Sequence, residues 1–344
     1  MSTDFSDTPL PFPQYPCAGS TIEVCPGVHW LSTPLPFRLK AVNLYLLEDD
    51  EGWTIVDCGY AKPNVRSQWE AVWAKTLNGK PVNRLIATHF HPDHLGNAKW
   101  ICERWQLSPW ITQSEWLTAQ SAWHGANGGS VADRLEFYAK NGLDEIQQES
   151  FKAQTVPYSV GAQLPKHYHR LFDGDELVIN GRVWKVIVGR GHSPEHASLY
   201  CAELNVFISG DQLLPEITTN VSVWADEPTA DPLGLFLDSL KHLKSVLPHK
   251  ALVLPAHRRP FTRVHERIEE LESHHQERLQ KVMDATAQGS ITAAHLLPVL
   301  FSPDLDGHQV GFAVGEALAH LNYLVRQGML RRIDDKGLVF FVRE

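Results

Sequence analysis

The sequence has 344 residues, a formal net charge of −9 at pH 7 and a hydrophobic share of 43%. This length suits one large domain with a small one, and this hydrophobic share is ordinary for a packed globular protein. The acidic balance argues against a nucleic-acid partner, because such binding relies on Lys and Arg patches. No apolar run is long enough to cross a bilayer, so we expect no membrane partner.

The cysteines and the N-terminus indicate a reducing compartment. The five cysteines are scattered and odd in number, which suits free thiols better than a disulfide framework. Residues 1–20 form a Pro-rich N-terminal extension without the basic start and apolar run of a secretory signal. We therefore expect a cytoplasmic protein.

The first part of the chain alternates between short strands and amphipathic helices. Apolar runs bounded by turn residues predict strands over 21–24, 28–31, 41–47, 53–56, 84–88 and 109–112. Apolar residues at helical spacing predict helices over 63–77 and 94–105.

Between the strand 84–88 and the helix that follows lies Thr88-His89-Phe90-His91-Pro92-Asp93-His94. A helix cannot direct His89, His91 and His94 to one point, because residues two apart do not share a helical face. A tight turn after a strand can fold all four ligand-type side chains inward, and Pro92 suits such a turn. Imidazoles with a carboxylate are ligands of zinc and similar divalent metals, so the turn predicts a metal site.

The segment 114–169 differs in character, because it is mostly helical. It predicts helices over 114–123, 130–141 and 143–154, with Ser130 as an N-cap. We interpret it as a helical cap over the metal site. Its aromatic residues either line a substrate channel or only hold the cap to the core: Trp116, Trp123, Phe137, Tyr138 and Tyr158.

Strands return after the cap. A hairpin over 176–179 and 182–188 turns at Asn180-Gly181, and further strands follow over 197–202, 206–209 and 251–254. Asp231-Pro232 begins a helix with an apolar stripe to Val246. His192 and Asp211 thus fall on loops at strand ends, where a rigid scaffold can direct side chains.

The C-terminal part is helical and ends in a hairpin. We expect helices over 262–288, 291–300 and 310–327, then strands over 329–333 and 338–342, as in a small winged-helix unit. His265, His274 and His275 are expected to be solvated. Residues 290–344 hold five Lys/Arg against six Asp/Glu, which favours packing or homodimer formation over nucleic-acid binding.

Five short segments of the chain together resemble one family. His-Phe-His-Pro-Asp-His is similar to the HxHxDH signature of the metallo-β-lactamase superfamily, and four other segments match its remaining elements in order. These are Val56-Asp57-Cys58-Gly59, Gly191-His192-Ser193-Pro194-Glu195-His196, Ser209-Gly210-Asp211 and Pro255-Ala256-His257. The resemblance runs from about Thr21 to about His257, and the tail is similar to that of the lactamase-beta-like and glyoxalase II-like branch.

The resemblance implies an α+β fold, a four-layer αββα sandwich with a helical cap insertion and a small C-terminal domain. We expect the catalytic domain over 21–260, with its cap at about 114–169, and a winged-helix-like domain over 261–344. A departure from the pattern is Glu195, where the common motif has glycine before its second histidine.

The resemblance also implies the site. Two divalent ions are expected, zinc by preference, with manganese or iron as alternatives. His89, His91 and His192 would hold one ion, Asp93, His94 and His257 the other, and Asp211 would bridge them. Asp93 is also the expected catalytic proton acceptor, and Asp57 and His196 would orient the ligands from outside.

The implied activity is hydrolysis by a metal-activated hydroxide, with acyl thioesters such as acyl-CoA as the leading small-molecule substrate. Lactones or other carboxylic esters are the near alternative. Phosphodiester cleavage of RNA, persulfide oxygenation at a single iron and a non-catalytic sensor stay open. The substrate-binding residues are not identified, although Arg258 and Arg259 are candidates to meet an anionic group.

Overall fold

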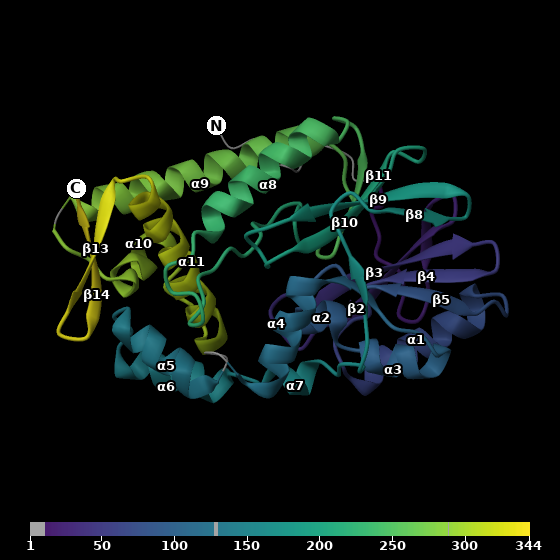
Figure 1. Ribbon diagram of the computed structural model, residues 1–344, viewed down its shortest axis with the longest axis horizontal. Coiled ribbons are helices and arrows are strands. Elements are labelled where there is room, and N and C mark those ends of the chain that lie inside the picture. The colour runs from purple at the N-terminus through teal and green to yellow at the C-terminus, as the bar shows by residue number, and fades with distance from the viewer. Residues whose placement is uncertain (1–10, 127–129, 288) are drawn as a thin grey trace.

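The computed structural model describes residues 11–126, 130–287 and 289–344. Two β-sheets lie face to face and helices cover their outer faces, while a separate group of helices and a hairpin lies at one end of the molecule (Figure 1). The first ten residues of the expected N-terminal extension lie outside the described residues.

The first sheet has seven strands in chain order. Pairing is antiparallel from β1 to β4 and parallel from β4 to β7. The strands are β1 (Ile22–Cys25), β2 (Val28–Pro34), β3 (Ala41–Asp49), β4 (Gly52–Val56), β5 (Val82–Ile86), β6 (Trp110–Thr112) and β7 (His169–Leu171). The short strand β7 was not predicted, because its sequence His-Arg-Leu has no apolar run.

The second sheet has five strands in the order β12-β11-β10-β9-β8. They are β8 (Glu176–Ile179), β9 (Arg182–Gly189), β10 (His196–Cys201), β11 (Val206–Gly210) and β12 (Leu252–Pro255). The predicted hairpin turn is confirmed, since Asn180 and Gly181 have φ of 51° and 69°, as a turn with two left-handed residues requires.

Burial on both faces explains why strand β3 is almost continuously apolar. Its alternate residues Val42, Leu44 and Leu46 pack under the helices, while Tyr45 and Leu47 face the second sheet. Successive strand side chains point to opposite faces, so such a strand needs apolar residues at every position. The core between the sheets and the cores beneath the outer helices thus make the four layers.

Helices α1 (Pro63–Thr76), α2 (Pro92–Leu95) and α3 (Ala98–Trp105) lie on the first sheet. The prediction of one helix from His94 to Trp105 is wrong, because the chain breaks at Gly96 and Asn97. The Asn97 side chain donates to the carbonyl oxygens of Cys58, Gly59 and Tyr60. A Cβ on Gly96 would lie 2.5 Å from the Gly59 oxygen, so tertiary contact and not helix propensity decides this bend.

The cap insertion divides into two parts. Helices α4 (Gln113–His124) and α7 (Tyr158–Gly161) lie near the first sheet and the turn that holds α2. Helices α5 (Val131–Lys140) and α6 (Glu145–Gln154) instead pack beside α11 at the other end of the molecule (Figure 1). Ser130 caps α5 as predicted, accepting a hydrogen bond from the Asp133 amide.

Helix α8 (Pro232–Val246) covers the second sheet, and α9 (Val264–Thr286) runs beside it. The tail continues through η2 (Ala293–Leu296), α10 (Leu297–Leu300), α11 (Gly307–Arg326) and the hairpin β13 (Leu330–Asp335) and β14 (Leu338–Arg343). The predicted αββα fold with a helical insertion is confirmed. The winged-helix comparison and the domain boundaries stay predictions. No helix in the described part of the chain combines the length and apolar character that a membrane crossing requires.

The expectation that His275 is solvated is wrong. Its side chain is buried in the core between α9 and α11, 3.2 Å from the His320 ring, and Phe236 packs against it. Burial lowers the pKa of His275 to about 2 and that of His320 to about 4. Arg278, His274 and the buried carboxyl of Glu316 complete this cluster.

This cluster predicts loss of stability in acid. Both histidines stay neutral in the folded state but bind a proton near pH 6.5 when unfolded, so the free energy of unfolding should fall as pH drops from about 6.5 toward 4. Between pH 7.5 and 5.5 the pair should contribute about 2–3 kcal/mol, partly offset by the raised pKa of Glu316. Urea unfolding at pH 7.5 and 5.5 measures this difference in the free energy of unfolding. The double variant His275→Gln/His320→Gln should show a shallower pH dependence, and an unchanged dependence would contradict the assignment.

Candidate metal centre

Asp57 links the end of β4 to Thr88, the first residue of the histidine turn that follows β5. It follows β4 with a φ of 61°, an unusual backbone for a non-glycine residue. Its carboxylate accepts hydrogen bonds from the Thr88 amide at 2.7 Å and the Thr88 hydroxyl at 2.8 Å. It also lies 2.8 Å from His94 Nδ1, which fixes the ring so that Nε2 points to the centre.

One group of converging side chains contains His89, His91, His192 and Asp211. The Nε2 atom of His89 lies 2.9 Å from His91 Nδ1 and 3.2 Å from His192 Nε2. An Asp211 oxygen lies 3.4 Å from His192 Nε2 and 3.9 Å from His89 Nε2. Three separate loops therefore supply lone pairs to one point.

A second group contains Asp93, His94 and His257. The His257 Nε2 atom lies 3.5 Å from Asp93 and 3.4 Å from Asp211, whose other oxygen lies 3.5 Å from His94 Nε2. Asp211 therefore lies between the two groups. The structure thus brings together all seven residues that the sequence indicated as ligands.

These residues fit divalent ions. Four ligands at the usual zinc–nitrogen distance of about 2.0–2.1 Å in a tetrahedron are about 3.3 Å from one another, and the distances between ligand atoms given above, 2.9 to 3.9 Å, lie around this value. His94 Nε2 and Asp211 Oδ1 are buried and lack a hydrogen-bond partner among the described residues. Buried polar atoms without partners are costly, and a coordinated cation would satisfy both.

The electrostatics agree with a cation at this place. Burial lowers the pKa of His89 well below its usual value and that of His91 to about 3, so both rings are neutral, as ligands must be. Burial also lowers the pKa of His257. The carboxylates of Asp211 and Asp93 outweigh this effect and raise the pKa of His257 to about 10. The two carboxylates therefore favour positive charge beside them.

Backbone and side-chain partners orient the remaining ligands. His192 Nδ1 lies 2.8 Å from the Asn220 carbonyl and His257 Nδ1 lies 3.0 Å from the Ala41 carbonyl, so each ring points Nε2 inward. His196 is buried, and its Nε2 accepts a hydrogen bond from the Asp211 amide at 3.1 Å. A Cβ on Gly210 would lie 2.4 Å from that nitrogen, which explains the glycine before Asp211.

Glu115 is a positioning residue that the sequence analysis missed. It lies in the first turn of α4, fully buried, and one carboxylate oxygen accepts from the Ser193 hydroxyl at 2.6 Å and the Glu195 amide at 2.7 Å. Its other oxygen accepts from the Phe90 amide at 2.9 Å. Glu115 thereby joins the loop of His192 to the turn of His89 and His91. Burial raises its pKa to about 7, against these three hydrogen bonds.

A second set of anchors holds the loop of His257. Asn43 and Tyr45 of β3 both donate to the Pro255 carbonyl, at 2.9 and 2.8 Å, and the Asn43 amide donates to the Ala256 carbonyl at 2.7 Å. The sequence analysis treated both residues as part of an apolar strand. The available signal was Asn43 itself, because a polar side chain within a buried strand needs a hydrogen-bond partner.

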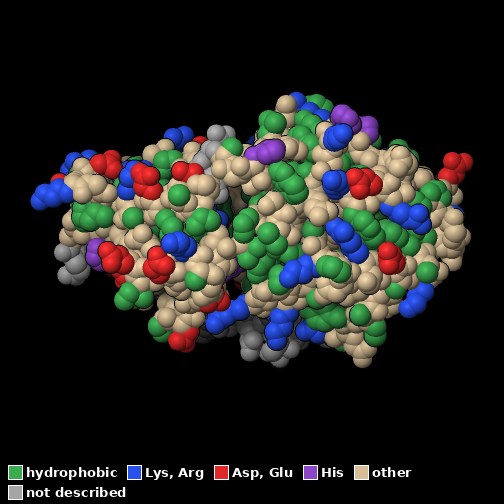
Figure 2. Space-filling model, turned by 90° about the horizontal axis from the view of Figure 1, so that it is seen from below, with side chains coloured by type: hydrophobic (Ala, Val, Ile, Leu, Met, Phe, Trp, Pro, Cys, Tyr) green, Lys and Arg blue, Asp and Glu red, His purple; other side chains and the backbone are tan. Residues whose placement is uncertain are grey.

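A cavity of about 750 Å³ opens beside His91. Figure 2 shows that face hollowed between the two halves of the molecule, with hydrophobic side chains beside the hollow. Of the cap aromatics, Trp123 and Tyr158 line the cavity, whereas Phe137 and Tyr138 belong to the core beneath α11 and Trp116 stacks on Tyr168.

Neither Arg258 nor Arg259 is among the described residues that line the cavity. Arg259 donates to the Pro13 carbonyl at 3.0 Å, and the Arg258 carbonyl accepts from Asn43. These contacts give the two arginines a structural place, and the expected contact with a substrate anion stays without support.

Comparison with known proteins agrees with this geometry. Residues 38–257 match the model of the metallo-beta-lactamase superfamily, and residues 279–344 match the metallo-beta-lactamase-like C-terminal domain. The chain therefore belongs to the metallo-beta-lactamase superfamily, and it is a metallo-hydrolase of that superfamily with a metal-binding cluster of His and Asp.

Individual relatives cover different shares of the chain. A crystal structure of a beta-lactamase domain protein from Burkholderia ambifaria is similar at 41% identity with a TM-score of 0.90, covering 96% of each chain. A probable metallo-hydrolase of Bacillus subtilis (strain 168) is 22% identical over 90% of this chain and 96% of its own length. An atrochrysone carboxyl ACP thioesterase of Emericella nidulans is 28% identical over 40% of this chain and 36% of its own length.

Glu115→Gln tests the link between the ligand loops. The amide oxygen can still accept from Ser193 and Glu195, but the amide nitrogen then faces the Phe90 N–H, donor against donor. We expect a loss of about 1–3 kcal/mol in the free energy of unfolding and a metal affinity about 10–100-fold weaker. Urea unfolding and metal titration measure the two. Glu103→Gln on the exposed face of α3 is the matched control, and equal behaviour of both variants would refute the role of Glu115.

Proposed function

We propose that this metallo-hydrolase cleaves acyl thioesters of small molecules, with acyl-CoA as the leading substrate. The observation that carries the proposal is the cavity beside the ligand cluster. Its volume of about 750 Å³ is in the range of small-molecule sites, and His91 and Pro92 of the histidine turn are among the residues that line it. A hydrolase for a compact polar substrate would not need a mainly apolar cavity of this volume.

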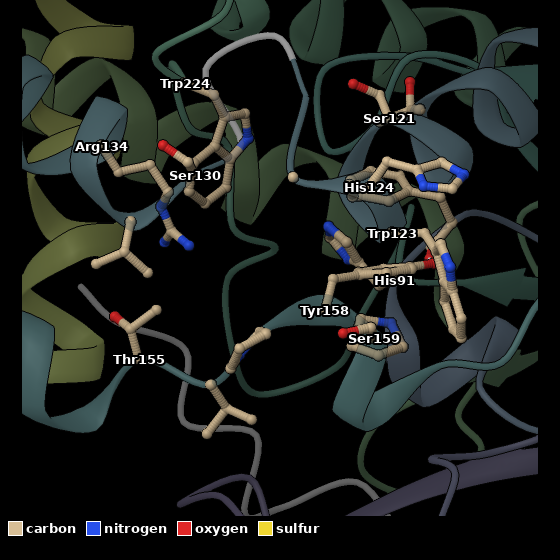
Figure 3. Close-up of a pocket in the computed structure, with 18 of the residues that line it drawn as sticks. His91, Ser121, Trp123, His124, Ser130, Arg134, Thr155, Tyr158, Ser159 and Trp224 are labelled. Atoms are coloured by element: carbon tan, nitrogen blue, oxygen red, sulfur yellow. The ribbon is translucent and has the colours of Figure 1, made fainter.

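The lining of the cavity is mainly apolar and aromatic. Phe90, Leu117, Trp123 and Tyr158 come from the turn and the insertion, while Trp224 and Phe312 come from the other half of the molecule. Figure 3 places Tyr158 and Trp123 close to His91, with Trp224 farther along the wall. Such walls bind acyl chains by removing apolar surface from water.

We propose that two divalent ions, zinc by preference, occupy the ligand cluster. His89, His91 and His192 would hold one, Asp93, His94 and His257 the other, and Asp211 would contact both. When bound, such a pair lowers the pKa of a water molecule toward neutrality and stabilises negative charge on a carbonyl oxygen.

The chain's own residues then direct the reaction. The water oxygen bonds to the thioester carbon, and the carbon–sulfur bond breaks. Asp93 lies beside His94 and His257 and stays ionised despite its burial, because those two rings lower its pKa. We assign it the role of accepting the water proton and passing it to the leaving sulfur. Asp57 and His196 hold His94 and Asp211 in place for this step.

Two further points support thioester hydrolysis. A thioesterase is among the relatives, although the match covers 40% of this chain. The net charge of −9 disfavours RNA as an alternative substrate. Lactones and other carboxylic esters share the carbonyl chemistry and enter the test as competing substrates. The expected absence of a nucleic-acid partner and the homodimer stay predictions.

Metal analysis tests the two-ion proposal. Elemental analysis should give about two ions per chain for wild type. His192→Ala and His257→Ala should each lose about one ion, since each removes a ligand from a different group. Full metal content in His257→Ala would exclude the second site. A wild type that binds no ion even when zinc is supplied would exclude both.

Hydrolysis measurements test the chemistry. Wild type should cleave acyl-CoA faster than matched lactones, carboxylic esters and phosphodiesters. Asp93→Asn keeps the size of the side chain but removes the basicity, so we expect a loss of about 10²–10⁴-fold or more in kcat with most metal in the first group retained.

Asp238→Asn on the exposed face of α8 is the control, and circular dichroism establishes that each variant folds. Activity of Asp93→Asn within a few-fold of wild type would remove Asp93 from the mechanism. Faster cleavage of lactones than of acyl-CoA would show that the proposed substrate class is wrong, while the assignment as a metallo-hydrolase would stand.

A further inference from the structure

An arginine stands in the wall of the cavity away from the metal cluster. Arg134 of α5 lines the same cavity as His91, and Figure 3 shows its guanidinium directed into the open space, across from His91 and Tyr158. Arg134 is half-buried in a wall that is mainly apolar and aromatic. Partial removal of its charge from water costs free energy unless a partner offsets it.

Aromatic rings are the contacts that hold this guanidinium. Its central carbon lies 4.8 Å from the Phe151 ring centre and 5.8 Å from the Trp224 ring centre. These two rings orient the planar group and offset part of its desolvation, and stacking on a ring leaves the edge of the guanidinium, where its N–H groups lie, able to meet an acceptor.

The Arg134 guanidinium has no carboxylate partner in the part of the chain that the structure describes. Its buried Nε atom also has no hydrogen-bond partner there. Tyr138 is a polar neighbour, and burial raises the pKa of its hydroxyl while the nearby guanidinium opposes that rise. Asp226 also lines the cavity, but its side chain is exposed.

We propose that Arg134 is a specificity residue that binds an anionic group of the substrate, while the scissile carbonyl lies at the metal cluster. This rests on the proposed function and narrows it to acyl compounds with a second negative charge beyond an apolar segment. The planar fork of arginine suits a carboxylate of the acyl group or a phosphate of the leaving group, since both offer paired oxygens.

Binding measurements test the proposal without any need for turnover. Isothermal titration of the metal-loaded protein compares glutarate, adipate and suberate with pentanoate, hexanoate and octanoate, which differ by one terminal carboxylate. A second comparison sets 4′-phosphopantetheine and CoA against pantetheine. The first differs from pantetheine by one phosphate alone, and CoA also carries the phosphorylated adenosine. In at least one comparison the ligand with the additional carboxylate or phosphate should bind more tightly, by about 10–100-fold, as hydrogen bonds to a charged group provide.

The variant Arg134→Met should abolish that preference and leave binding of the ligand without the additional carboxylate or phosphate within a few-fold of wild type. Arg170→Met is the matched control. Arg170 of β7 is exposed, its guanidinium carbon lies 4.4 Å from the Phe172 ring centre, and it is not among the described residues that line the cavity, so its loss should not affect binding. Should Arg134→Met fail to fold, Arg134→Gln serves with the same readout. The comparison in which Arg134→Met abolishes the preference identifies the group that Arg134 binds, either a carboxylate of the acyl group or a phosphate of the leaving group.

Absence of any preference in wild type, or a preference that survives loss of Arg134, would overturn the proposal. An Arg134-dependent preference in a protein that cleaves no thioester would refute the proposed function alone. Thioester cleavage without such a preference would refute the role of Arg134 alone.

Discussion

The rest of this structure depends on one constraint. Seven imidazole and carboxylate side chains converge in two adjacent groups. Imidazole nitrogens and carboxylate oxygens about 3–4 Å apart repel one another unless a proton or a cation lies between them. A fold that holds them there must supply rigid anchors, and it does so by ending strands at the cluster. Asp57 follows β4, His89 follows β5, His192 follows β9, Asp211 follows β11 and His257 follows β12.

Several of these side chains in turn have partners on or directly beside the strands. Ala41 and Asn43 of β3 hold His257 and its loop, although they lie more than two hundred residues away in the chain. Asp57 holds His94, and His196 at the start of β10 holds the Asp211 amide. A sandwich of two sheets brings these distant segments to one edge, and the free energy of burying the core between the sheets offsets the repulsion among the ligands.

The sequence indicated which side chains converge because short motifs encode them locally, as in the His-Phe-His-Pro-Asp-His turn. Their role as metal ligands stays a prediction. The sequence also predicted most strands, since two-sided burial produces apolar runs such as that of β3. It could not reveal Glu115 or Asn43, whose roles arise only when distant segments meet. For the same reason it placed one helix across Gly96 and Asn97, and it left His275 in solvent. In each of these cases a tertiary contact overrode the local pattern.

The helical insertion both stabilises the histidine turn and forms part of the cavity wall. The backbone of Phe90, between two ligands, is held by two residues of the insertion: its amide donates to Glu115, and its carbonyl accepts from the Tyr158 hydroxyl. The ring of Phe90 and that of Tyr158 both line the cavity, and Arg134 from the same insertion stands farther along its wall. The insertion therefore stabilises the histidine turn through backbone hydrogen bonds and shapes the cavity through side chains. Both bonds join a side chain of the insertion to the backbone of Phe90, so they do not require a particular side chain at position 90. Other residues of the wall can therefore change while Glu115 and Tyr158 keep the turn in place.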